Sequence, residues 1–311
     1  MFPAGSVQHD SRISLLFPLV ILAFRAPWNL PFGVLLWSAS LEREWGGHVA
    51  MIPARKTRFF NWWFPRHAEK LLRQSFDTVY VRGLEQTVAT ARERPILLVS
   101  NHTSWWDTIA VIYLVPRRLR LDGYAMMDEK NLRRFPFFAK VGAFGVDLGG
   151  GAADESLAYA TELLSQPERL VLIFAQGRER ASTVRPLGFR RGAAVIADRV
   201  PDAAVVPLGI RYEVAGTQYP LAFLSLGAPL PPAPDVEQGR SQQEAAVTGL
   251  LEDLDHTVVR LRDGEPDVLA QQGYAPVLRR PTGLMGPFAQ WILATVNRRF
   301  ARARRRDPPA P

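Results

Sequence analysis

The chain has 311 residues, which is enough for one large domain or two modest ones, and its 47% hydrophobic and 22% charged residues are typical of a globular protein. It contains no Cys, which excludes disulfides, Cys-ligated zinc, iron–sulfur clusters and thiol catalysis, and a mean hydropathy of -0.05 excludes a polytopic membrane protein. The net charge of +8 predicts an anionic partner: membrane lipid, nucleic acid or an acidic carrier protein.

Residues 1–50 form an apolar N-terminal extension unlike the rest of the chain. The uncharged run 13–24 is shorter than the roughly 20 residues of a spanning helix, and Arg25, Pro27 and Pro31 then interrupt it. The segment also lacks the basic start and cleavage site of a secretory signal. Two interpretations stay open, a membrane-inserted anchor and a native chain that begins at Met51.

The basic residues gather in two aromatic-rich segments. Residues 51–82 carry seven bases against two acids, a net charge of +5, and residues 297–306 carry six Arg and no acid. We expect an amphipathic basic and aromatic helix over 51–75 and a basic amphipathic tail over 281–311. Aromatic rings beside Lys and Arg suit a helix lying in the headgroup layer of an anionic membrane. The alternative is a core-packing helix with a solvated basic face. No recognition module for nucleic acid is present, so none is expected as a partner.

From residue 76 to about 280, short apolar runs alternate with stretches of helical periodicity, as in an α/β domain. Strands are expected at 79–82, 96–100, 121–126, 142–148, 170–174, 203–211 and 222–226. Helices are expected at 108–114, 130–140, 153–164, 192–197 and 241–262. Residues 227–239 are Pro-rich and predict a loop, and residues 264–287 are interrupted by Gly and Pro. The pattern therefore predicts an α/β sheet covered by helices on both faces.

The segment Asn101-His102-Thr103-Ser104-Trp105-Trp106-Asp107 carries the clearest chemical signal. A predicted strand runs into Asn101 and an apolar helix follows, so His102 lies at the carboxyl end of a strand, where α/β sheets place their ligands. Asp107, on the first turn of the helix, can accept the proton of one imidazole nitrogen and leave the other as a general base. Such a pair can deprotonate a bound hydroxyl for attack on a thioester. No His and carboxylate cluster has metal-ligand spacing, so no metal is expected.

This segment resembles the first block, His-x4-Asp, of the glycerolipid acyltransferase family, which includes the lysophosphatidic acid acyltransferases. Further blocks follow in the family's order over about residues 76–230. They are Gly142, Phe144 and Asp147; then 174–180, Phe-Ala-Gln-Gly-Arg-Glu-Arg; the basic 189–192; Val205-Val206-Pro207-Leu208-Gly209; and Leu226-Gly227-Ala228-Pro229. The resemblance implies a mixed sheet covered by helices on both faces and a catalytic domain over 76–280.

Three residues depart from the family's pattern where it binds the acceptor. Asp147 and Glu179 stand where the family has the two Arg associated with the acceptor's phosphate, and Gln176 stands for a Glu. Arg178 or Arg180 is the candidate replacement for phosphate binding. The resemblance thus assigns catalysis to His102 and Asp107, and substrate binding to Gln176, Gly177, Arg178, Arg180, Asp147 and Pro207.

The resemblance implies a membrane-associated O-acyltransferase of phospholipid biosynthesis, peripheral or monotopic on the cytoplasmic face of the cell membrane. It would move a fatty acyl group from acyl-CoA or acyl carrier protein, as co-substrate and without a cofactor, to a lysophospholipid such as 1-acylglycerol-3-phosphate. A phosphate-free acceptor, such as a glycolipid or a glycosylated carotenoid, is the alternative within the same class. A lipid hydrolase and a non-catalytic lipid-binding protein are alternatives of another class.

Overall fold

A computed structural model describes residues 51–147 and 153–281 of the chain. The apolar extension predicted over 1–50 lies outside the described residues, and so does the basic tail predicted over 281–311, apart from its first residue. In the part of the chain that is described, no helix is long and apolar enough to cross a membrane.

The described residues form one eight-stranded mixed sheet with the order β4-β3-β5-β2-β6-β7-β1-β8. Five neighbouring strands, from β4 to β6, are parallel, whereas β7 runs antiparallel to β6, and β8 antiparallel to β1. The strand bounds are β1 Thr78–Arg82, β2 Ile96–Ser100, β3 Asp122–Asp128, β4 Ala143–Val146, β5 Arg169–Phe174, β6 Ala204–Glu213, β7 Leu221–Leu226 and β8 Ala275–Arg279.

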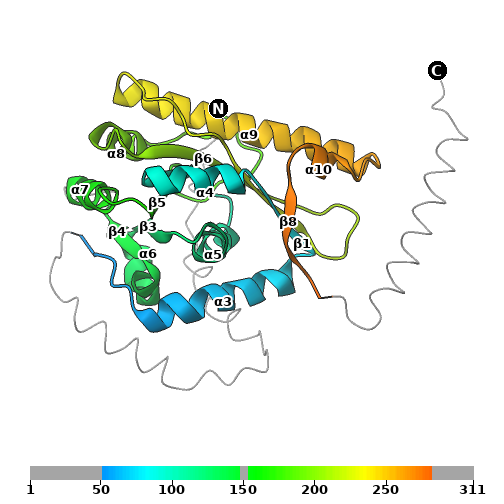
Figure 1. The fold of residues 1–311 in the computed structure, drawn as a ribbon, viewed down its shortest axis with the longest axis horizontal. Helices are drawn as coiled ribbons and strands as arrows, with labels where there is room; N and C mark the ends of the chain where they lie inside the picture. The colour runs from blue at the N-terminus through cyan, green and yellow to red at the C-terminus, as the bar shows by residue number, and fades with distance from the viewer. Residues whose placement is uncertain (1–50, 148–152, 282–311) are drawn as a thin grey trace, which may run out of the picture. The chain divides into compact units, whose positions relative to one another are not determined.

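Helices cover both faces of this sheet, as the sequence predicted, with α9 and α3 on opposite sides in Figure 1. One face is covered by α3 (Arg58–Ser75), α4 (Leu84–Glu93) and α5 (Trp105–Leu114), and the other by α7 (Ala153–Leu163), α8 (Gly192–Arg199) and α9 (Val236–Arg262). Shorter elements are a π-helical turn Val115–Leu119, α6 (Glu129–Arg134), a 3₁₀ helix Pro136–Val141 and α10 (Val268–Gln271).

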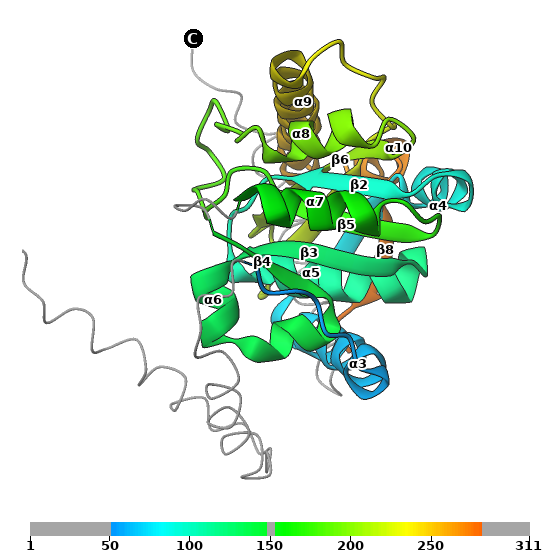
Figure 2. The ribbon, with the colours of Figure 1, turned by 90° about the vertical axis from the view of Figure 1, so that its left-hand side faces the viewer.

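Strand β2 lies within the parallel part of the sheet, between β5 and β6, as Figure 2 also shows. All five of its residues are buried, because successive side chains point to opposite faces and both faces are covered. Ile96 and Leu98 join the core under α5, whereas Leu97 and Val99 join the core under α7, α8 and α9. Ser100, its last residue, pairs with Phe174 on one side and with Leu208 on the other. The carboxyl ends of β2 and β5 therefore meet at one edge of the sheet, whereas β6 continues past them to Glu213.

Helix α3 confirms the helix predicted over 51–75 from Arg58 onwards, whereas residues 51–57 are not helical, and α3 is also part of the core. Its buried residues Phe64, Ala68 and Leu72 pack against the domain, whereas Phe59 and Trp62 are 61% and 55% exposed. The preceding residues are extended, and the carbonyl of Ile52 accepts a hydrogen bond of 2.7 Å from the amide of Gly145 in β4. One face of α3 thus packs on the core, and contact of its other face with a membrane stays a prediction.

Four elements of the described residues were not predicted: α4, the π-helical turn Val115–Leu119, α10 and β8. Helix α4 follows Gly83 in a stretch with little apolar periodicity, and it buries only Thr87 and Ala91. The region interrupted by Gly and Pro contains α10 and the edge strand β8, which pairs with β1. The loop predicted over 227–239 ends earlier than expected, because Asp235 caps α9 by accepting a hydrogen bond of 2.8 Å from the amide of Gln238.

Candidate active site

His102 follows β2 directly, at the edge where the parallel strands end. Its imidazole ring stacks on the ring of Phe174, the last residue of β5, at 4.2 Å between centroids and 12° between planes. Its backbone amide donates to Oε1 of Gln176 at 2.7 Å, and its carbonyl accepts from the amide of Arg180 at 2.9 Å. The loop after β5 therefore fixes both the ring and the backbone of His102.

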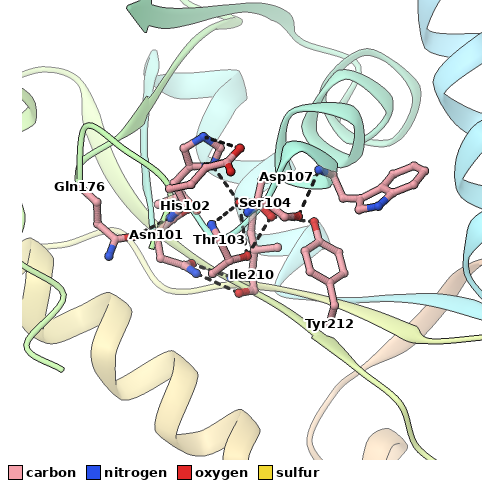
Figure 3. A network of polar contacts seen from close by, with 11 residues as sticks. Asn101, His102, Thr103, Ser104, Asp107, Gln176, Ile210 and Tyr212 are labelled. Atoms are coloured by element: carbon pink, nitrogen blue, oxygen red, sulfur yellow. Dashed lines mark hydrogen bonds and ion pairs between the residues drawn. The ribbon is translucent and has the colours of Figure 1, made fainter. Parts of the chain in front are cut away.

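Asp107 holds the imidazole from the first turn of α5. Its Oδ2 lies 2.9 Å from Nδ1 of His102, which leaves Nε2 on the other side of the ring (Figure 3). The carboxylate is fully buried, whereas the His102 side chain is 18% exposed. Since a carboxylate accepts hydrogen bonds only, this contact assigns the imidazole proton to Nδ1 and makes Nε2 an acceptor. The pair can therefore act as a general base towards a hydroxyl placed at Nε2.

The local sequence explains why Asp107 is in place. Ser104 caps α5 and Asp107 is the third helical residue, so the two form a capping box in which Asp107 accepts from the amide of Ser104 at 3.0 Å. The amide of Thr103 donates to the same oxygen at 2.5 Å. These amides and the positive end of the helix dipole compensate the burial of the carboxylate. The His-x4-Asp spacing thus also builds the helix N-terminus.

Tyr212 of β6 is a member of this site that sequence reasoning missed. Its hydroxyl donates to Oδ1 of Asp107 at 2.7 Å, as Figure 3 shows. Burial raises the pKa of Tyr212 well above its ordinary value, and the Asp107 carboxylate raises it further, so the phenol stays protonated and remains a donor. Tyr212 lies 105 residues after Asp107 in the sequence, so no local motif connects the two residues.

Asn101 ties the catalytic edge to the neighbouring strand. Its side-chain amide donates to the carbonyl of Ile210 at 2.9 Å, and its carbonyl accepts from the amide of Ile210 at 2.8 Å (Figure 3). This pair of bonds continues the β2–β6 ladder through a side chain after the strand has ended. It holds the first residue of the motif rigidly to the sheet, which fixes where His102 can lie.

A cavity of about 1120 Å³ opens beside His102. Apolar side chains from α5, β3 and β5 form much of its wall, and they include Val111, Ile112, Met126 and Leu172. Charged residues line other parts of it: Lys56, Asp122, Asp128, Asp154, Arg178, Glu179, Arg190, Arg191 and Arg199. A cavity with an apolar wall and charged positions beside a His–Asp pair is a suitable site for an amphiphilic substrate.

Lys56 occupies a further part of the cavity wall. Its ammonium group forms an ion pair with Asp122 and lies 3.9 Å from the ring centroid of Tyr124. Burial lowers the pKa of Lys56, although the Asp122 carboxylate opposes that shift. Burial also raises the pKa of Tyr124 to about 12. The Lys56 ammonium group therefore already contacts the Asp122 carboxylate and the Tyr124 ring.

The structure separates the substrate-binding residues that the sequence suggested. Gly177 and Arg178 line the cavity beside His102. Gln176 is buried between His102 and the carbonyl of Leu187, to which its Nε2 donates at 3.0 Å. Arg180 donates to the same carbonyl at 3.0 Å, so its guanidinium group supports the loop. Of the two Arg proposed to replace a phosphate ligand, Arg178 is the one in the cavity wall.

Asp147 and Pro207 lie away from the cavity wall. Asp147 comes directly after β4, and Pro207 is buried within β6, where it pairs with Val99. The ring of Pro207 fills the space beside Gly227, whose amide donates to the Pro207 carbonyl at 2.9 Å. Neither residue is among those that line the cavity.

Gly177 is required by the turn that follows β5. Its φ is +66°, which L side chains rarely adopt, and an added Cβ would lie 2.7 Å from Nε of Arg190. The turn brings Arg178 and Glu179 back towards His102, so that Oε1 of Glu179 lies 3.9 Å from Nε2. No group of three or more His, Cys, Asp or Glu residues suited to a metal ion occurs among the described residues.

Comparisons with known proteins bear on the family and the fold. Residues 78–211 match the family model described as Acyltransferase. The fold is similar to that of the 1-acyl-sn-glycerophosphate (LPA) acyltransferase PlsC from Thermotoga maritima, with a TM-score of 0.50 and 18% sequence identity over 78% of this chain and 97% of that chain. A likeness at this identity shows the fold.

A second solved structure is a much weaker match. The pilus retraction motor PilT with bound ADP has 6% identity and a TM-score of 0.26, over 54% of this chain and 57% of that chain. That likeness carries no argument. Comparison with curated proteins gave no match.

Proposed function

We propose that the chain, of which residues 78–211 match the Acyltransferase family model, is a glycerolipid acyltransferase and transfers a fatty acyl group from a thioester to a hydroxyl group of a membrane lipid. The observation that carries the proposal is the His102–Asp107 pair, whose Nε2 side opens on a large, partly apolar cavity. A general base alone is not specific for acyl transfer. The apolar wall of the cavity beside this base is suited to binding an acyl chain.

The chemistry follows from the assigned tautomer. Nε2 of His102 takes the proton of the acceptor hydroxyl as its oxygen attacks the thioester carbonyl, and Asp107 stabilises the imidazolium that forms. The new C–O bond is completed as the C–S bond breaks, and the proton passes to the leaving thiolate. No side-chain nucleophile is needed, so we expect no acyl-enzyme intermediate.

The donor is proposed to be acyl-CoA or acyl carrier protein. The apolar wall formed by α5 and β5 suits the acyl chain, and the exposed Arg178, Arg190 and Arg191 suit the phosphates that both donors carry. Charge does not separate the two donors, because basic residues also attract an acidic carrier protein.

The acceptor is proposed to be a lipid with a reactive hydroxyl. A lysophospholipid such as 1-acylglycerol-3-phosphate is the first acceptor to test, because the T. maritima protein with the similar fold is a 1-acyl-sn-glycerophosphate acyltransferase. A phosphate-free lipid is the second, and the carboxylate of Glu179 near His102 is the observation that favours it.

We also propose that the protein works as a peripheral protein on an anionic membrane at the cytoplasmic face. Phe59 and Trp62 are exposed on α3, and Trp105 is 52% exposed at the start of α5, three residues after His102. Arg66 lies over the ring of Trp62, with its guanidinium carbon 4.6 Å from the centroid. Exposed aromatic rings beside basic residues suit the headgroup layer of a bilayer.

The test is acyl transfer by the purified full-length protein and its His102→Ala variant, with labelled acyl-CoA or acyl carrier protein and a panel of lysolipid and glycolipid acceptors. The expected result is an acylated lipid product that depends on both His102 and the acceptor. Release of free fatty acid without acceptor would instead identify a hydrolase. If neither the wild type nor His102→Ala consumes thioester or forms a lipid product, the result would indicate a lipid-binding role.

A further inference from the structure

Glu179 places a carboxylate where the acceptor has to bind. Its Oε1 lies 3.9 Å from Nε2 of His102, on the open side of the ring, and its side chain lines the cavity. From this geometry we infer that the acceptor is an uncharged lipid with a second hydroxyl beside the reacting one, and that Glu179 accepts a hydrogen bond from that second hydroxyl. The inference rests on the proposed function and names the chemical class of its acceptor.

The distance between the two groups fits a vicinal diol. The reacting hydroxyl must lie within about 2.6–3.2 Å of Nε2 to give up its proton. An oxygen on the adjacent carbon then falls within reach of Oε1, since O–H···O hydrogen bonds measure about 2.5–3.0 Å. A carboxylate accepts and does not donate, so it recognises a hydroxyl hydrogen and not a carbonyl or an ether. The two residues therefore contact adjacent hydroxyls of one headgroup.

The same carboxylate opposes a phosphate at this position. In 1-acylglycerol-3-phosphate, the phosphate is carried by the carbon next to the reacting hydroxyl, so it would lie close to Glu179. Among the described residues, no Lys or Arg lies within ion-pair distance of the Glu179 carboxylate, and the nearest titratable partner is the imidazole of His102. Within this part of the chain its negative charge therefore has no cationic side chain beside it, and two like charges at this range repel each other.

The basic side chains of the cavity are compatible with this assignment. Arg190 packs against Gly177, and Arg178 precedes Glu179, but neither is paired with the Glu179 carboxylate. These guanidinium groups remain suited to the phosphates of the thioester donor. The cavity thus places the Glu179 carboxylate beside His102, where the acceptor would bind. Its guanidinium groups lie elsewhere and would bind the phosphates of the donor.

The experiment compares acceptors that differ by one group. The full-length protein and its Glu179→Gln and His102→Ala variants are assayed with labelled palmitoyl-CoA or palmitoyl acyl carrier protein. Three acceptors are compared in mixed micelles: 1-monooleoylglycerol, 1-oleoyl-3-deoxyglycerol, which lacks the neighbouring hydroxyl, and 1-oleoylglycerol-3-phosphate. A monoglycosyl lipid provides a second vicinal diol. Glu252→Gln, an exposed position on α9, is the matched control.

We expect the wild type to favour both diols over the deoxy acceptor and over the phosphate acceptor by roughly 10- to 100-fold in kcat/KM, the effect of one hydrogen bond to a charged group. Glu179→Gln should lose most of this preference, chiefly through the KM of the diols, and should affect the deoxy acceptor much less than the diols. Glu179→Asp should restore part of it. A residue that only supported the fold would affect all acceptors equally.

Two results would overturn the inference while leaving acyl transfer intact. One is a wild type that prefers the phosphate acceptor, and the other is a Glu179→Gln variant that loses all acceptors to the same extent. If no acceptor is acylated in a His102-dependent manner, the proposed function itself fails, and the acceptor assignment fails with it.

Discussion

The hydroxyl of Tyr212 in β6 donates a hydrogen bond of 2.7 Å to Oδ1 of Asp107 in α5, opposite the oxygen that holds His102. One buried carboxylate thus connects the base to a central strand, and its two oxygens are used for different tasks. Oδ2 orients the imidazole, while Tyr212 and the hydroxyl of Thr103 contact Oδ1. Because the orientation of the base depends on these contacts, several predictions concern Asp107 and its partners.

Removing either member of the pair should abolish acyl transfer. We expect His102→Ala and Asp107→Asn each to lower kcat by on the order of 10³-fold, because the first removes the base and the second leaves it in the wrong tautomer or orientation. Single-turnover transfer with labelled thioester measures this. His67→Ala, on α3, is the control and should retain activity. An Asp107→Asn enzyme with wild-type kcat would contradict the assigned role of the carboxylate.

The stability contributed by Tyr212 should disappear at alkaline pH. Its folded-state pKa is raised above 10.0, so its contribution is fully present below pH 10 and is lost as the pH rises through the folded-state pKa. The stability difference between wild type and Tyr212→Phe should therefore shrink above pH 10, by up to about 1.4 kcal/mol per pH unit. Urea unfolding of both proteins at pH 8 and pH 10.5 measures it. A difference that is constant or larger at pH 10.5 would be inconsistent with a buried, protonated phenol.

Gln176→Glu should destabilise the site although it changes few atoms. Nε2 of Gln176 donates to the Leu187 carbonyl, and a carboxylate oxygen there would face that carbonyl without a hydrogen. We expect a loss of about 1–3 kcal/mol in the free energy of unfolding. Gln86→Glu, at an exposed position on α4, should be close to neutral. Equal stability of the two variants would show that the Leu187 contact contributes little.

Narrowing the apolar part of the cavity should change the acyl chain that the enzyme accepts. Ile112 of α5 lines this wall, and Ile112→Trp adds volume there, so long acyl-CoA donors should lose activity by roughly tenfold or more relative to short ones. Ile112→Leu conserves the volume and should keep the wild-type profile. The kcat/KM for donors of increasing chain length gives the answer. An unchanged profile in the Trp variant would place the acyl chain elsewhere.

A negative charge introduced on the exposed face of α3 should weaken binding to an anionic membrane. We expect Trp62→Glu to reduce co-sedimentation with vesicles containing anionic lipid by several-fold, because a carboxylate replaces an aromatic ring in the headgroup layer. Val259→Glu is the control: its side chain is 57% exposed on α9, across the sheet from α3. Equal losses in the two variants would indicate a general effect of charge.

Much of the fold could be predicted from the sequence because its signals are local. The buried strand over 96–100 was predicted with its observed bounds, because a continuous apolar run between Pro95 and Asn101 leaves few alternatives. Helix α4 was missed because it buries only two residues, and β8 because an edge strand with one buried residue lacks the alternation of a core strand. Both elements depend on tertiary contacts, which a local pattern of apolar residues does not reveal.

By itself, the sequence determined the α/β class, the helices on both faces and the position of His102 and Asp107 on either side of a strand-to-helix turn. These features depend on neighbouring residues, since strand burial, the capping box and a five-residue spacing are all encoded within a few positions. Only the tertiary structure decided which distant side chains meet there. Tyr212 reaches Asp107, Arg178 enters the cavity wall while Arg180 supports the loop, and Glu179 lies beside Nε2. The order of the strands in the sheet and the turn at Gly177 set these contacts.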